Sequence, residues 1–97
     1  KTFVTNFISK KIIITGTVQG VGYRRWLQKI CNDKGVVGWV TNKKNGDVEA
    51  FFFKVGYEIF TNILSECFLG PKNSCVTNIL VDDFEEEITS NNFEIRS

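Results

Sequence analysis

The residues of this chain best suited to chemistry form a glycine-rich run, Gly16-Thr17-Val18-Gln19-Gly20-Val21-Gly22-Tyr23-Arg24. The apolar segment Ile12–Ile14 precedes this run, and an amphipathic helix follows it. A glycine-rich turn between a strand and a helix lets backbone N–H groups converge on one point, and the helix N-terminus adds a partial positive charge. Arg24, in the first turn of that helix, has a guanidinium that can bind two phosphate oxygens. The run therefore predicts an anion pocket with a permanent positive charge at its mouth.

The elements that must position this pocket can be read from the spacing of apolar residues. A helix is predicted after Gly22, because its apolar residues follow the spacing of one buried helical face, and Asn32–Gly35 ends it with a glycine. Two strands follow at Val36–Thr41 and Val48–Phe53. Asn45-Gly46 joins them as a hairpin, since both central residues of a type I′ turn need positive φ.

The second half of the chain predicts another helix and two strands. Apolar residues between Val55 and Cys67 lie on one helical face, and Gly70-Pro71 ends this helix. The alternation at Val76–Val81 indicates a fourth strand. Asp82–Asn92 is acidic and polar, which is typical of a solvated loop, and Phe93–Ile95 alternates like a short final strand.

This order of elements predicts an α+β fold, a ferredoxin-like βαββαβ sandwich. We expect an antiparallel sheet with two helices on one face and a short extra C-terminal strand. The first and third strands pair in the centre of such a sheet, and the second lies beside the third. The Phe51–Phe53 run places aromatic rings on both faces, with Phe52 exposed or covered by the N-terminal segment. Residues 1–97 are expected to form a single domain, with residues 1–9 as a loosely ordered N-terminal extension.

Composition limits the classes of function. The chain has 97 residues, 42% of them apolar, and its 12 basic and 11 acidic residues give a net charge of only +1, which argues against nucleic-acid binding. Its three cysteines show no zinc-type spacing and predict reduced thiols in a cytoplasmic protein. We expect no metal and no cofactor. We also expect no membrane contact, since no segment approaches the roughly 20 apolar residues that span a bilayer.

Several motifs together resemble the acylphosphatases. After Gly16–Arg24 come Gly35–Asn42, then Asn45-Gly46-Asp47-Val48-Glu49, then Gly70-Pro71 and the closing Phe93-Glu94-Ile95-Arg96, all in the family's order. The resemblance extends from about Lys11 to Arg96, and its first two blocks are the most specific.

The resemblance implies a monomeric acylphosphatase that hydrolyses the carboxyl-phosphate bond of a small-molecule acyl phosphate without a metal. Arg24 falls on the family's phosphate-binding arginine and Asn42 on its water-positioning asparagine. The phosphoryl group would be bound by Arg24 and by the N–H groups of the loop, which comprises Gln19, Gly20, Val21, Gly22, Tyr23 and Arg24. Arg25 reads as a solvated helix residue that points elsewhere, and Tyr23 and Trp39 as core or pocket wall.

Other classes of function fit less well. No cysteine has the Cys-x₅-Arg spacing of cysteine phosphatases, no histidine is present, and Gly20-Val21-Gly22 is not followed by the Gly-Lys-Ser/Thr of a Walker loop. Two alternatives stay open. One is a ferredoxin-like RNA-binding module that stacks bases on Phe51–Phe53. The other is an acylphosphatase-like accessory domain of a larger carbamoyl-transfer or maturation enzyme.

Overall fold

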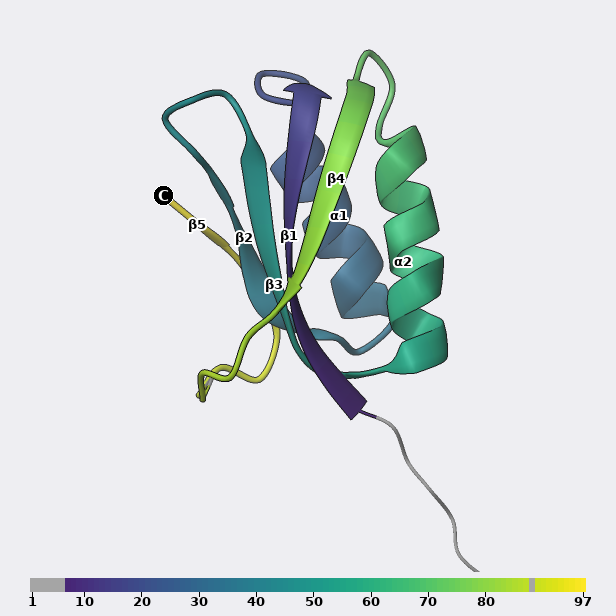
Figure 1. Ribbon diagram of the computed structural model, residues 1–97, viewed down its shortest axis with the longest axis vertical. Coiled ribbons are helices and arrows are strands. Elements are labelled where there is room, and N and C mark those ends of the chain that lie inside the picture. The colour runs from purple at the N-terminus through teal and green to yellow at the C-terminus, as the bar shows by residue number, and fades with distance from the viewer. Residues whose placement is uncertain (1–6, 88) are drawn as a thin grey trace, which may run out of the picture.

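The computed structural model describes residues 7–87 and 89–97, which form two helices packed on one face of a five-stranded sheet (Figure 1). The sheet order is β4-β1-β3-β2-β5. The elements are β1 (Phe7–Thr17), α1 (Tyr23–Asp33), β2 (Val37–Asn42), β3 (Val48–Gly56), α2 (Tyr57–Leu69), β4 (Cys75–Asp83) and β5 (Phe93–Arg96). The predicted ferredoxin-like architecture, with β1 and β3 in the centre, is confirmed.

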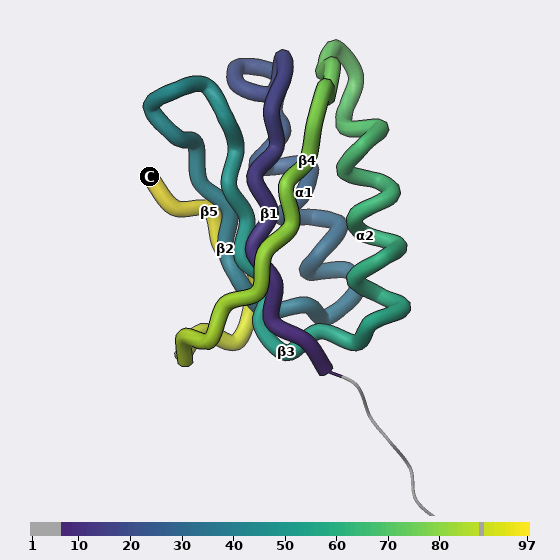
Figure 2. The backbone as a smooth tube through the Cα atoms, viewed as in Figure 1, coloured from purple at the N-terminus to yellow at the C-terminus, as the bar shows by residue number. Residues whose placement is uncertain are grey.

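The sheet is mixed, which corrects the prediction of an antiparallel one. The strands β4, β1, β3 and β2 pair antiparallel, but β5 pairs parallel to β2, with Gly38 opposite Phe93 and Thr41 opposite Arg96. After β4 the chain crosses to the opposite edge of the sheet and returns in the direction of β2 (Figure 2). This crossing gives β2 a neighbour on each side.

Two strands are longer than their apolar segments predicted. β1 begins at Phe7, so Phe7–Ser9, which we assigned to the N-terminal extension, belong to the sheet; residues 1–6 lie outside the described residues. At this end of β1, Lys10 and Lys11 lie opposite Asp83 and Asp82 of β4, and Lys10 forms an ion pair with Asp83. Opposite charges across the two strands extend the ladder beyond the apolar core, so these aspartates are not in the predicted loop.

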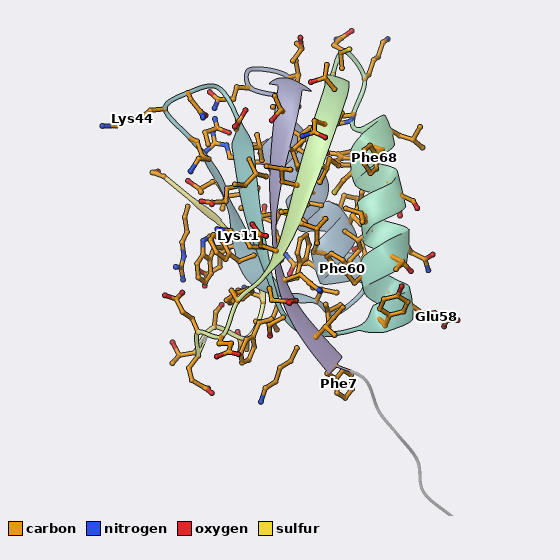
Figure 3. The ribbon with its side chains drawn as sticks, viewed as in Figure 1. Phe7, Lys11, Lys44, Glu58, Phe60 and Phe68 are labelled. Carbon is orange, nitrogen blue, oxygen red and sulfur yellow. The ribbon has the colours of Figure 1, made fainter. Side chains whose placement is uncertain are left out.

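The core lies between the sheet and the two helices. Phe52 is completely buried and packs edge-to-face on Phe60 of α2, which points from the helix toward the sheet (Figure 3). The expectation that Phe52 is exposed or covered by the N-terminal segment is therefore wrong. Its neighbours Phe51 and Phe53 occupy the other, open face because side chains alternate along a strand. Within the described residues, no helix is long and apolar enough to cross a membrane.

One buried hydrogen bond joins the two helices. The hydroxyl of Tyr23, at the start of α1, donates to the backbone carbonyl of Cys67 in α2 at 2.5 Å. The residue four positions after Cys67 is Pro71, which has no N–H to supply the usual helical bond. Burial raises the pKa of the Tyr23 hydroxyl far above its ordinary value, so this group stays a protonated donor.

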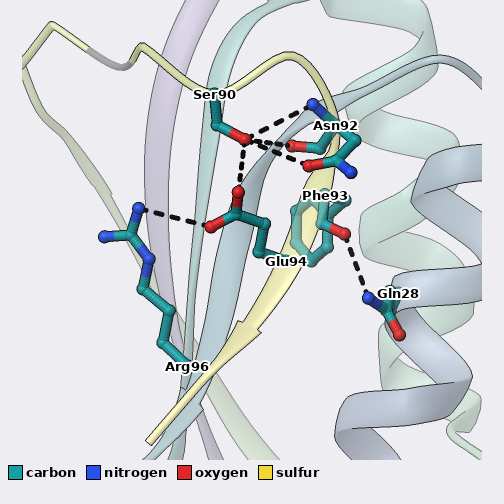
Figure 4. Close-up of polar contacts among 6 residues, drawn as sticks. All are labelled: Gln28, Ser90, Asn92, Phe93, Glu94 and Arg96. Carbon is teal, nitrogen blue, oxygen red and sulfur yellow. Dashed lines mark hydrogen bonds and ion pairs between the residues drawn. The ribbon is translucent and has the colours of Figure 1, made fainter.

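The edge strand β5 is held by side chains of α1. The backbone N–H of Phe93 donates to the side-chain oxygen of Asn32 at 2.8 Å, and its carbonyl accepts from Gln28 and Asn32, each at 3.2 Å. Ser90 donates to Glu94 at 2.7 Å just beyond (Figure 4). These contacts fix where β5 runs along β2.

Replacing Tyr23 with phenylalanine tests the link between the helices. The change leaves the buried Cys67 carbonyl without its donor, so we expect the free energy of unfolding to fall by about 1–3 kcal/mol. Urea unfolding followed by circular dichroism measures this. The control is Tyr57→Phe, because Tyr57 is 62% exposed and its change should cost less than about 0.5 kcal/mol. Equal stabilities of the two variants would contradict the assigned role.

Candidate active site

A pocket of about 510 Å³ opens at the end of the sheet where β1 and β2 finish. Because β1 and β2 both run antiparallel to β3, their C-terminal ends lie at the same end of the sheet (Figure 1). The walls of the pocket come from the β1–α1 loop, the first turn of α1, the end of β2, and β5. The residues that line it are Val18, Gln19, Gly20, Gly22, Tyr23, Arg24, Arg25, Asn42 and Ile95. The fold thus brings Arg24 and Asn42 to one pocket.

The first turn of α1 presents uncapped backbone N–H groups to this pocket. Gly22 precedes the helix with φ of 79°, a left-handed conformation that suits glycine. Its hydrogen side chain cannot cap the helix, and the first turn carries no acidic residue. The N–H groups at a helix start lack partners within the helix and carry the positive end of its dipole. This end of α1 is therefore suited to an anion.

Close packing of backbone fixes where the loop begins. Gly16 has φ of 134°, and a Cβ atom there would lie 2.0 Å from the carbonyl oxygen of Cys75 in β4. Any larger residue would push β1 away from β4. The glycine thus allows the strand to turn into the loop while it stays against its neighbour.

Gln19 joins the loop to the β2–β3 hairpin. Its side-chain amide nitrogen donates to the carbonyls of Lys43 at 2.7 Å and Asp47 at 2.8 Å. The same two carbonyls accept from the N–H groups of Gly46 and Lys43, which close the hairpin. Both hydrogens of the amide are used in this Gln19 bridge, so within the predicted loop this residue can offer an anion only its backbone N–H.

Asn42, the last residue of β2, contributes an amide to the pocket. Its side-chain oxygen is buried and, among the described residues, has no hydrogen-bond partner. Burying an unpaired amide oxygen costs about 1–3 kcal/mol, so such groups are rare unless they bind something. An amide offers both a donor and an acceptor, which is what the orientation of a small polar molecule requires.

Two arginines line the pocket, and none of the residues that line it is acidic. Arg24 is half-buried and Arg25 is exposed. In the described part of the chain, neither guanidinium lies within ion-pair distance of a carboxylate. Arg25, which we expected to be a solvated residue, is indeed exposed, but it also lines the pocket.

The remaining predicted residues take different places. The Tyr23 side chain belongs to the core, and Val21 does not line the pocket but packs partly buried against the core. Trp39 lies half-buried on the open face, where Arg96 stacks on its ring at 3.9 Å. Ile95 forms an apolar wall that sequence patterns did not indicate, since its place depends on the parallel pairing of β5 with β2.

Comparisons with known proteins agree with this geometry. The profile of the acylphosphatase family, described as Acylphosphatase, matches residues 10–95. A protein named Acylphosphatase from Rhodopseudomonas palustris (strain BisB5) is 36% identical over 75 residues, which cover 76% of this chain and 74% of that protein. The chain belongs to the acylphosphatase family. The predicted family is thereby confirmed.

Solved structures confirm the fold. The crystal structure of acylphosphatase from Bacillus subtilis superposes with a TM-score of 0.85 at 28% identity and covers 93% of this chain and 99% of that one. Full-length HypF, in a phosphate- and nucleotide-bound form, contains the same fold with a TM-score of 0.81 at 23% identity. That match covers 100% of this chain but 13% of the HypF chain, and it shows a shared fold alone.

The Gln19 bridge can be tested by replacing Gln19 with leucine. The variant loses both hydrogen bonds to the hairpin carbonyls, so we expect hydrogen exchange at the Lys43 and Gly46 amides to accelerate about tenfold or more. NMR measures these rates. In the control Gln28→Leu, which removes a bond to Phe93 instead, the hairpin rates should not change. Unchanged hairpin exchange in Gln19→Leu would show that the bridge does not hold the hairpin.

Proposed function

We propose that this chain hydrolyses the carboxyl-phosphate bond of acyl phosphates, without a metal, at the pocket between the β1–α1 loop and Asn42. Family membership supports the reaction class. The observation that carries the site assignment is the unpaired, buried amide oxygen of Asn42, which lies in the same pocket as Arg24 and the uncapped start of α1. The start of α1 and Arg24 suit a phosphoryl group, and the Asn42 amide suits a water molecule.

In this proposal the phosphoryl group is bound by backbone and by one cation. The N–H groups of Gln19–Arg24 surround its oxygens, and the Arg24 guanidinium binds two of them. The site excludes carboxylates from its lining, so no negative charge opposes the substrate dianion. The same groups stabilise the charge on the equatorial oxygens in the transition state, because they are fixed before the reaction begins.

Asn42 orients the water that attacks phosphorus in line with the leaving group. A bond forms between the water oxygen and phosphorus, and the bond from phosphorus to the acyl oxygen breaks. The water proton passes to a phosphate oxygen, and the products are a carboxylate and inorganic phosphate. A carboxylate is a good leaving group, so the reaction needs no general acid. Tyr23 is not required as one, since its hydroxyl is bonded to Cys67 and its pKa is raised by burial.

The absence of a metal stays a prediction, as do the monomeric state and the lack of nucleic-acid binding. A cytoplasmic location is also proposed, supported by the three cysteines, which are free thiols: Cys31 and Cys67 are buried and Cys75 is exposed. The physiological substrate is a small acyl phosphate in this proposal.

Hydrolysis of benzoyl phosphate in the presence of EDTA tests the two roles. In Arg24→Ala we expect KM, and the inhibition constant of inorganic phosphate, to rise about 100-fold, because a bidentate charged contact contributes about 3 kcal/mol.

In Asn42→Ala we expect kcat in the same assay to fall about 10²–10³-fold, with little change in the inhibition constant of inorganic phosphate.

The matched control is Asn62→Ala, which changes an exposed asparagine of α2 outside the pocket and should preserve both constants. A folded wild-type chain without turnover would overturn the proposed function. Loss of turnover on addition of EDTA would overturn its metal-free chemistry, and full kcat in Asn42→Ala would remove Asn42 from the mechanism.

A further inference from the structure

The pocket has room and charge beyond what one phosphoryl group uses. Its volume of about 510 Å³ lies in the range of sites that hold whole small molecules. In addition to Arg24 and the loop amides, a second arginine, Arg25, lines it. The mechanism above gives Arg25 no task, although among the described residues its charge is not balanced by a carboxylate.

Arg24 and Arg25 cannot both bind the phosphoryl group in the same geometry. Adjacent residues of an α-helix point about 100° apart around its axis, so neighbouring side chains do not face one target together. The two side chains also differ in burial, because Arg24 is half-buried and Arg25 is exposed. Arg25 therefore offers its charge at the rim of the pocket.

The direction of the reaction indicates what lies at that rim. In an in-line displacement the attacking water and the leaving acyl oxygen are on opposite sides of phosphorus. Asn42 holds the water in the proposed function, so the acyl group extends from phosphorus away from the Asn42 amide. Arg25 lines the same pocket from α1, so its charge is available to an acyl group that occupies the remaining space.

A second hollow of about 500 Å³ also contains Asn42, but it does not compete for this role. It is lined by hairpin residues on the Asn42 side, and there Glu49 lies 3.8 Å from the Lys43 ammonium. Lys44 points away from the hairpin tip into solvent (Figure 3). The positive charge of Lys43 in this hollow is therefore partly neutralised, unlike that of Arg25.

We propose that Arg25 is a specificity-determining residue that selects acyl phosphates whose acyl group carries a second negative charge, such as a carboxylate. This inference rests on the proposed function and names the substrate class of the same site. An ion pair at an exposed rim is weaker than a buried one. We therefore expect a preference of up to about fivefold in kcat/KM for the substrate with the additional anion.

The test compares benzoyl phosphate with 4-carboxybenzoyl phosphate, whose rigid para carboxylate cannot attack its own acyl carbon. For the wild-type protein the ratio of kcat/KM, carboxylated over unsubstituted, should be about five. In Arg25→Gln the ratio should fall to about one, and Arg25→Lys should retain most of it. The control Lys29→Gln removes an exposed α1 cation that does not line the pocket, and the wild-type ratio should persist.

The outcomes separate this inference from the function on which it rests. No turnover of benzoyl phosphate by the folded wild-type chain would overturn both. Turnover of benzoyl phosphate with a wild-type ratio near one would overturn only the role of Arg25. Equal losses on both substrates in Arg25→Gln would assign Arg25 to the phosphoryl group and would also overturn the inference.

Binding of non-reacting analogues gives a second measurement. Titration calorimetry with benzylphosphonate and 4-carboxybenzylphosphonate should show about fivefold tighter binding of the carboxylated compound to the wild-type protein. Addition of 0.5 M salt should reduce this difference, because an exposed ion pair is screened. Equal affinities at low salt would contradict the proposal.

Discussion

Two hydrogen bonds from the Gln19 amide connect the β1–α1 loop to the β2–β3 hairpin, and the shape of the pocket depends on them. The loop leads into the uncapped start of α1, and the turn of the hairpin begins immediately after Asn42. No backbone ladder can make this connection directly, because β3 lies between β1 and β2 in the sheet. A side chain that spans the end of β3 is the shortest route. In the proposed mechanism the loop and Asn42 must be held in a fixed relative position, since small displacements of a reacting group lower the rate by large factors.

Polar groups around the pocket lack the hydrogen-bond and charge partners that polar groups in the core have. The Asn42 side-chain oxygen is the one buried side-chain polar atom without a partner among the described residues. The same pocket holds an uncapped helix start and two arginines. Each of these features would stabilise the fold if it were paired internally. A folded chain tolerates such groups where ligands complete them, and its stability must come from elsewhere. Here the Tyr23–Cys67 bond and the contacts of β5 with α1 provide part of it.

Sequence patterns predicted the elements and the residues Arg24 and Asn42 that the fold brings to one pocket, because these features are local or are carried by a motif. The helices, the hairpin at Asn45-Gly46 and the glycine-rich loop all have signals within a few residues. What the patterns missed depends on tertiary pairing. The direction of β5, and with it the place of Ile95, follows from how the chain crosses the sheet. The strand character of Asp82 and Asp83 follows from lysines more than seventy positions away. The role of the Gln19 side chain needs the hairpin to be in place, and the glycine-rich motif alone suggests a ligand contact.

The topology also explains how a nearly neutral chain can present a strongly cationic site. The net charge is +1, yet the residues that line the pocket include two arginines and no acid. β4 runs antiparallel to β1, so the acidic residues that end β4 and follow it lie at the opposite end of the sheet from the pocket. Charges on the surface are screened over about 10 Å at moderate salt, so the distant carboxylates weaken the field at the pocket little. The separation of these carboxylates from Arg24 and Arg25 along the sheet therefore leaves a positive local charge at the pocket despite the small net charge.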